Sequence, residues 1–217
     1  MPLQAVIFDF DGLILDTETP EATGWEKEFA RHGLSIPDGW WAGLTGRGPE
    51  EVLEWPEDLL VRLLGEPIDR EATLARVNEV RLAGIEAAQI LPGVREVVEQ
   101  AKELDLEVAI ASSSKRDWIE GHMKRRWNPH PFLIMATRER VARAKPQPDL
   151  YLLAASELGV PPANCLALED SPNGIAAAKA AGMICVAVPN SVTKQLDLSQ
   201  ADQVLDSLEQ LDLKQWL

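Results

Sequence analysis

Two carboxylates stand two residues apart directly after the first apolar run of the chain. That run, Gln4 to Phe8, reads QAVIF and is followed by Asp9, Asp11 and Gly12. Carboxylates this close repel one another unless a cation lies between them. Mg2+ prefers carboxylate and water oxygens as ligands and would also neutralise an incoming anion. The pair therefore indicates a metal site, with an ordinary acidic turn as the plain alternative.

Hydroxyl groups and a lysine follow two later apolar runs. Ser112–Ser114 come after LEVAIA (Leu106–Ala111), and Lys145 lies in the loop AKPQPD that follows FLIMA (Phe132–Ala136). Serine hydroxyls and backbone N–H groups at the start of a helix can hold phosphate oxygens, although N-capping explains serines as well. A proline-stiffened loop is an unusual place for a flexible cation unless its position matters. Lys145 is therefore a candidate anion ligand, with a surface lysine as the alternative.

A second acid pair follows the fourth apolar run. Glu169 and Asp170 come after CLAL (Cys165–Leu168) and precede Ser171 and Pro172. Serine followed by proline suits the N-cap and first residue of a helix. Capping explains the serine and the proline, but it does not explain why two acids precede them.

Near-continuous apolar runs alternate with helical patterns along most of the chain. A fifth run, ICVAV, spans Ile184–Val188, and apolar residues recur at spacings of three and four in 93–104 and 149–158. Such alternation predicts an α/β fold with a doubly wound, Rossmann-like parallel sheet that has helices on both faces. In open parallel sheets, ligands bind beyond the carboxyl ends of the strands. The acid pairs, the serines and the lysine are therefore expected to converge on one rim.

One segment near the start of the chain breaks this alternation. Residues 18–86 show helical periodicity without a convincing strand. We therefore expect an all-helical cap over 18–86, inserted into an α/β core formed by 1–17 and 87–217. Four of the seven tryptophans fall in this segment and are expected to form its small core: Trp25, Trp40, Trp41 and Trp55.

The composition limits the classes of partner. The 217 residues carry a net charge of −14, which disfavours nucleic acid and anionic membranes. No run reaches 18 apolar residues and the first residues lack a basic leader, so a soluble, cytoplasmic protein is expected. Cys165 and Cys185 lie in apolar stretches and are expected to be buried thiols rather than a disulfide. The oligomeric state is not readable from the sequence.

The four polar groups, taken in order, resemble the motifs of the haloacid dehalogenase superfamily. The matching segments are Phe8–Gly12 (FDFDG), Ala111–Ser114 (ASSS), Lys145–Asp149 (KPQPD) and Glu169–Gly174 (EDSPNG). The chain is most similar to the β-phosphoglucomutase-like and phosphoglycolate-phosphatase-like branch, in which a helical cap follows the first motif. Four motifs in this order and spacing are far more specific than a lone Asp-x-Asp pair.

The resemblance implies roles for the core residues. It makes Asp9 the nucleophile that attacks phosphorus and forms an aspartyl-phosphate, and Asp11 the general acid and then the general base. It also implies that the Ser112 hydroxyl and the Ser113 N–H hold phosphate oxygens, and that Lys145 pairs with both Asp9 and the phosphoryl group. The cap is expected to close over the site and exclude water.

The same resemblance implies a Mg2+ cofactor and a contact from the cap. The ion would be held by Asp9, the backbone carbonyl of Asp11 and Asp170, with Glu169 as an outer or direct ligand. In the cap, the segment TGRG resembles a specificity loop, which makes Arg47 a candidate substrate ligand. The expected partner is a small phosphorylated metabolite.

The resemblance predicts a phosphatase and leaves a sugar-phosphate mutase as the main alternative. In mutases of this branch a histidine lies ten residues after the second aspartate of the first motif, and here that position is Glu21. A carboxylate cannot take the role of that histidine, so hydrolysis is favoured over phosphoryl transfer. A phospho-accepting signalling receiver is much shorter and has no helical insertion, and a true dehalogenase has no need of Asp11.

Overall fold

The computed structural model describes residues 2–44 and 52–217, and its centre is one parallel sheet. The six strands lie in the order β3-β2-β1-β4-β5-β6. Every adjacent pair is parallel. Their bounds are Ala5–Phe8 (β1), Glu107–Ala111 (β2), Ile134–Ala136 (β3), Cys165–Glu169 (β4), Ile184–Ala187 (β5) and Gln203–Val204 (β6). The five predicted strands are confirmed to within two residues at each end, and β6 was not predicted.

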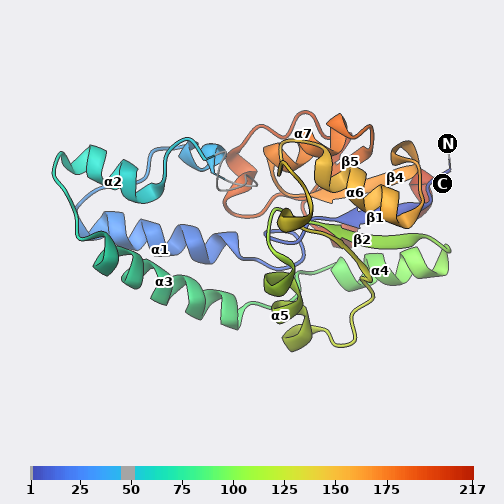
Figure 1. Ribbon diagram of the computed structural model, residues 1–217, viewed down its shortest axis with the longest axis horizontal. Helices are drawn as coiled ribbons and strands as arrows, with labels where there is room; N and C mark the ends of the chain where they lie inside the picture. The colour runs from blue at the N-terminus through green and yellow to red at the C-terminus, as the bar shows by residue number, and fades with distance from the viewer. Residues whose placement is uncertain (1, 45–51) are drawn as a thin grey trace.

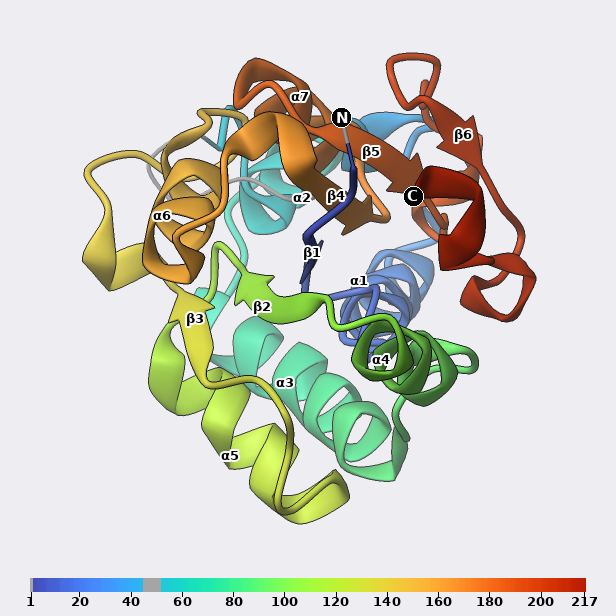
Figure 2. The ribbon, with the colours of Figure 1, turned by 90° about the vertical axis from the view of Figure 1, so that its right-hand side faces the viewer.

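Helices cover both faces of the sheet, as the doubly wound prediction requires. Val6 and Phe8 point into the cluster that includes α4 (Val94–Glu103) and α5 (Arg116–Arg126). The intervening residues of β1, Ala5 and Ile7, point into the cluster that includes α6 and α7. Helix α6 spans Asp149–Leu158 and α7 spans Pro172–Ala180. Figure 2 shows the two helical layers on either side of the sheet. Because both faces are buried, β1 is apolar at every position rather than at every second one.

The cap consists of helices that lie beyond one end of the sheet. Within 18–44 and 52–86, its helices are α1 (Glu18–Arg31), α2 (Pro56–Leu64) and α3 (Arg70–Ala87), with a short 3-10 helix at Trp40–Gly43. Helices α1 and α3 lie side by side, and the cap projects from the core on the side away from both chain termini (Figure 1). None of the described helices is long and apolar enough to span a membrane.

The core of the cap is smaller than the tryptophan content suggested. Trp25 is buried with Phe29 and the α2 leucines, and Trp40 and Trp41 pack against this cluster while remaining partly accessible. Trp55 differs, because it is 40% exposed and lines the pocket described below. The expectation of a four-tryptophan core is therefore wrong for Trp55.

Two chain segments connect the cap to the core, and they lie next to each other. Leu15 forms an antiparallel bridge with Ile90, and the Leu91 N–H donates to the Ile14 carbonyl at 2.9 Å. Arg126 of α5 holds the second connection. Its guanidinium donates to three backbone carbonyls at the end of α3, those of Ile85, Glu86 and Ala88. A cation at a helix C-terminus satisfies carbonyls that have no partner within the helix.

Candidate active site

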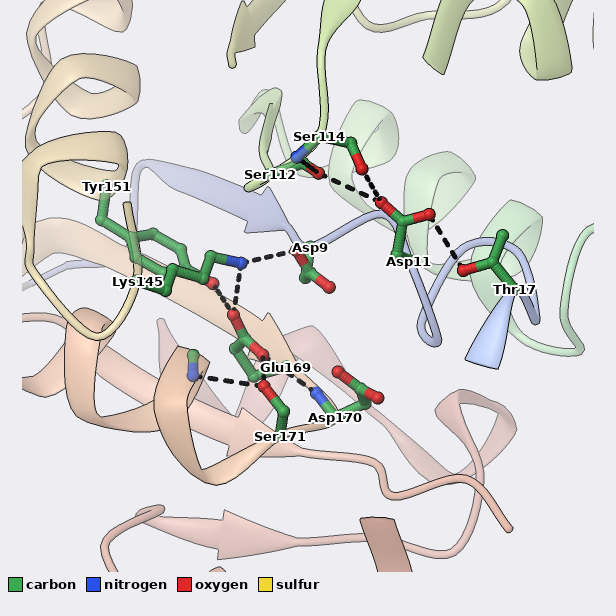
Figure 3. A network of polar contacts seen from close by, with 11 residues as sticks. Asp9, Asp11, Thr17, Ser112, Ser114, Lys145, Tyr151, Glu169, Asp170 and Ser171 are labelled. Carbon is green, nitrogen blue, oxygen red and sulfur yellow. Dashed lines mark hydrogen bonds and ion pairs between the residues drawn. The ribbon is translucent and has the colours of Figure 1, made fainter. Parts of the chain in front are cut away.

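A buried lysine lies between two carboxylates at the carboxyl end of the sheet. Asp9 follows β1, and its Oδ1 accepts a hydrogen bond from the Lys145 Nζ at 2.5 Å. The same Nζ donates to Glu169 Oε1 at 2.6 Å (Figure 3). Lys145 is only 1% exposed. Burial alone would lower the pKa of Lys145, but the two adjacent carboxylates outweigh burial and raise it. Lys145 is therefore a fixed positive charge, as the loop position suggested.

Both carboxylate oxygens of Glu169 accept hydrogen bonds. Besides Lys145, Oε1 accepts from the Tyr151 hydroxyl at 2.6 Å, while Oε2 accepts from the Asp170 N–H at 3.2 Å and the Ser171 hydroxyl at 3.3 Å. The chain leaves no space beside this carboxylate, because a Cβ on Gly174 would lie 2.0 Å from it. Glu169 is thus held rigidly against the lysine and the start of α7.

Three buried carboxylates form a group that could hold a metal ion. One oxygen each from Asp9, Glu169 and Asp170 lies within 4.8 Å of the others. Burial raises the pKa of Asp9 well above its usual range, although the Lys145 cation opposes this, and burial likewise raises the pKa of Asp170. The lysine supplies one positive charge for three carboxylates, so ionisation of all three would leave negative charge uncompensated. Hard oxygen donors with uncompensated negative charge suit a divalent cation such as Mg2+.

The environment of Asp170 includes residues that the motifs did not indicate. Its Oδ2 accepts from the Asn190 Nδ2 at 2.6 Å, and the same amide donates to Glu18 Oε2 at 3.0 Å. Burial raises the pKa of Glu18 to about 7. Gly12 has a φ of +89°, and a Cβ there would meet Asp170 Oδ2 at 2.4 Å. The turn after Asp11 therefore requires glycine, both for its backbone conformation and for the approach of Asp170.

Asp11 lies on the opposite side of the site, where four donors from the described part of the chain surround its carboxylate. Oδ1 accepts from the Thr17 hydroxyl and the Trp118 indole N–H, each at 2.9 Å. Oδ2 accepts from the Ser114 hydroxyl at 2.6 Å and the Ser112 hydroxyl at 3.4 Å. Thr17, which directly precedes α1, therefore bonds directly to the candidate acid (Figure 3).

A pocket of about 500 Å³ between core and cap joins these groups. Asp9, Asp11, Ser112, Ser113 and Lys145 all line it. Glu169 and Asp170 are buried and do not line it, and Glu169 contacts the lining residue Lys145. The predicted core residues are thus brought together. Arg47 lies outside the described residues.

The cap side of the pocket carries an ion pair and aromatic rings. Glu21 Oε2 pairs with the Arg81 Nε at 3.2 Å, and Glu21 Oε1 accepts from the Trp25 indole at 3.0 Å. Burial raises the pKa of Glu21 despite the neighbouring arginine. Trp41 and Trp55 line the same side. Glu21 therefore faces the pocket rather than solvent alone.

Four residues around the site were not found from the sequence. Asn190 follows β5, so extending the strand-end argument to the fifth apolar run would have reached it. Tyr151 and Glu18 lie on the first turns of α6 and α1. Trp118 is the third residue of α5 and had no sequence signal, because an indole on a helix is usually part of a core.

Comparison with known proteins agrees with the geometry. The family model for haloacid dehalogenase-like hydrolases matches residues 3–182. YhcW of Bacillus subtilis (strain 168), which bears the provisional name of a phosphatase, is 41% identical over 216 residues, covering 97% of this chain and 94% of that protein. Hexitol phosphatase A of Escherichia coli (strain K12) is 30% identical, with 97% and 94% covered.

A solved structure gives the same result in three dimensions. A variant of CbbY from Rhodobacter sphaeroides in complex with xylulose-(1,5)bisphosphate has a TM-score of 0.70 and 28% identity, and the match covers 96% of each chain. The relatives and the solved structure match nearly the whole chain, and the family model matches residues 3–182. The chain belongs to the haloacid dehalogenase-like hydrolases.

Proposed function

We propose that this protein is a Mg2+-dependent phosphatase of small phosphorylated metabolites that uses Asp9 as a covalent nucleophile. The observation that carries the proposal is the contact of Asp9 with Lys145 at 2.5 Å, within a group of three buried carboxylates at the base of the pocket. The cation fixes the position of the carboxylate at the end of the strand, and packing still leaves the carboxylate able to react. Such a group can attack phosphorus when a substrate enters.

The chain supplies the remaining groups for transfer of a phosphoryl group. In the first step, Asp9 attacks phosphorus and the bond to the leaving oxygen breaks, while Asp11 gives that oxygen a proton. In the second step, water attacks phosphorus, Asp11 takes its proton and Asp9 is released. Ser112, Ser113 and Lys145 would hold the phosphoryl oxygens and stabilise their charge.

A metal ion fits the acidic group on the core side. Asp9, Asp170 and the backbone carbonyl of Asp11 would hold Mg2+, with Glu169 as an outer partner because its oxygens already accept four hydrogen bonds. When bound, Mg2+ would neutralise the negative charge shared by the carboxylates and the phosphate. Asp9 would then approach the anionic phosphate without electrostatic repulsion.

The substrate we infer is a phosphorylated sugar or polyol. Hexitol phosphatase A and the CbbY complex with xylulose-(1,5)bisphosphate support this class. The pocket agrees with it, because Glu21 and Arg81 offer an acceptor and donors for hydroxyl groups, while Trp41 and Trp55 offer rings for the C–H faces of a sugar.

Hydrolysis is the outcome we propose, rather than transfer to a second hydroxyl. The position that carries histidine in the related mutases holds Glu21, which is bound to Trp25 and Arg81. A mutase must protect its aspartyl-phosphate from water until a second hydroxyl arrives. An acidic side chain already engaged in an ion pair does not provide the switchable contact that such protection needs.

The test is phosphate release from a panel of sugar and polyol phosphates, with and without Mg2+, by wild type and Asp9→Asn. The amide is nearly isosteric but a poor nucleophile, so activity should fall below about one hundredth of wild type. Asp206→Asn, an exposed substitution near the C-terminus, is the matched control. Retention of substantial activity by Asp9→Asn would disprove covalent catalysis by this residue.

A further inference from the structure

Trp118 reaches the candidate acid from a helix of the core. It is the third residue of α5, lines the active-site pocket and donates its indole N–H to Asp11 Oδ1 at 2.9 Å. The ring packs edge-on against His122, with 4.3 Å between ring centroids. His122 is itself buried, and its Nδ1 contacts Arg126, the arginine that binds the end of α3. Packing therefore fixes the direction of the indole N–H.

The four donors around Asp11 differ in what they can do. Thr17, Ser112 and Ser114 present hydroxyls, which can rotate and act as donor or acceptor. Trp118 presents an indole N–H, which can only donate. Asp11 Oδ1 must therefore remain a hydrogen-bond acceptor for as long as the contact with Trp118 persists.

This asymmetry assigns different tasks to the two oxygens of Asp11. A proton on Oδ1 would have to point at Thr17 and would leave the indole N–H only a weakly accepting hydroxyl oxygen. A proton on Oδ2 faces serine hydroxyls that can turn to accept it, and it leaves Oδ1 as the strong acceptor for the indole. Oδ2 is also the oxygen beside Ser112, the residue we place on the phosphoryl group. The oxygen free to carry a proton is thus the one on the phosphate side.

We propose that Trp118 is a positioning residue that fixes Oδ2 of Asp11 as the oxygen that exchanges the catalytic proton. The inference rests on the proposed function. As Asp9 forms its bond to phosphorus and the bond to the leaving oxygen breaks, the Oδ2 proton moves to that oxygen and an alcohol leaves. The water that then attacks phosphorus returns a proton to Oδ2, and the bond between Asp9 and phosphorus breaks to release phosphate.

The experiment compares two substrates whose leaving groups need protonation to different degrees. Benzyl phosphate releases a strongly basic alkoxide unless it is protonated, whereas 4-nitrophenyl phosphate releases a stable phenolate of similar size. Trp118→Phe keeps most of the ring and removes the N–H. Its kcat/KM should fall about ten- to hundredfold with benzyl phosphate and less than about threefold with 4-nitrophenyl phosphate, because only the former depends on the acid.

The ratio of the two kcat/KM values protects the test against poor folding. A fraction of inactive protein lowers both values equally and leaves their ratio unchanged. Trp127→Phe, at the other end of α5 and packed against Phe132, is the matched control and should not change the ratio. An equal loss with both substrates, or no loss, would overturn the proposal. Failure of the wild type to hydrolyse either substrate would instead count against the proposed function.

A double variant tests whether Trp118 acts through Asp11. In an Asp11→Asn background there is no proton to position, so adding Trp118→Phe should cost no further activity with benzyl phosphate. A further tenfold loss in that background would show that the indole acts on the substrate or the fold independently of Asp11.

Discussion

Replacing Lys145 by methionine should destabilise the protein strongly in the absence of metal. The ammonium contacts Asp9 at 2.5 Å and Glu169 at 2.6 Å, and the side chain is 1% exposed. Methionine fills a similar volume but leaves both buried carboxylates without a counter-charge. Removing one partner of a buried ion pair costs about 3–5 kcal/mol. In a chain of this size that corresponds to a melting temperature about 6 to 20 °C lower.

The assay is urea unfolding in the presence of a chelator, followed by tryptophan fluorescence. Lys179→Met is the matched control, since Lys179 forms an equally short pair with Asp202 at 2.6 Å but on the surface. Exposed pairs contribute at most about 1 kcal/mol. Adding Glu169→Gln to Lys145→Met should restore part of the stability, because it removes one unpaired charge.

The result that would refute this reasoning is a small effect. If Lys145→Met lowered the free energy of unfolding no more than the control, by about 1 kcal/mol or less, the carboxylates would not depend on the lysine for compensation. Addition of Mg2+ should stabilise Lys145→Met more than wild type, because the variant carries one positive charge fewer. Equal stabilisation of both proteins would show that the ion does not compensate the same carboxylates.

Three further results are expected. Ca2+ should compete with Mg2+ for binding without supporting turnover, since its larger shell lets Asp9 coordinate through both oxygens; full activity with Ca2+ alone would contradict the dual role of Asp9. In chelator, stability should fall as the pH rises from about 5 to 8, because the pKa of Glu18, raised to about 7, makes the folded state bind more protons than the unfolded state over that range. Glu18→Gln should flatten the dependence of stability on pH, measured by urea unfolding. An unchanged slope would exclude Glu18 as the group responsible. With β-glucose 1-phosphate and a trace of the 1,6-bisphosphate, free phosphate should exceed glucose 6-phosphate, and the reverse would favour a mutase.

The sequence predicted the core of the site because that core follows from the sheet. Asp9 and Glu169 lie at the ends of neighbouring strands, and parallel strands bring their carboxyl ends to one edge whatever the details of side-chain packing. Lys145 was predicted because proline-stiffened loops restrict where a lysine can lie. These inferences needed only the order of strands and turns.

Other features depend on packing that a one-dimensional pattern does not contain. Strand β6 has two residues, one of them exposed, so no apolar run marks it. Trp118 contacts a residue more than a hundred positions earlier in the chain, and the tertiary packing of α5 brings them together. Trp55 was assigned to the cap core because exposure of an indole to a pocket cannot be read from its neighbours in sequence.

The adjacent connections between cap and core determine how the cap can move. Because these segments are joined at Leu15 and Ile90, we expect them to form a single pivot for rotation of the cap. Helix α3 has 18 residues, so its far end lies about 27 Å from the pivot. A rotation about the pivot would displace Glu21, which is close to the pivot on α1, only slightly. The same rotation would displace the α2 end of the cap several times farther. Substitutions far out on the cap can therefore alter which molecules enter, while the reacting groups near the pivot keep their alignment.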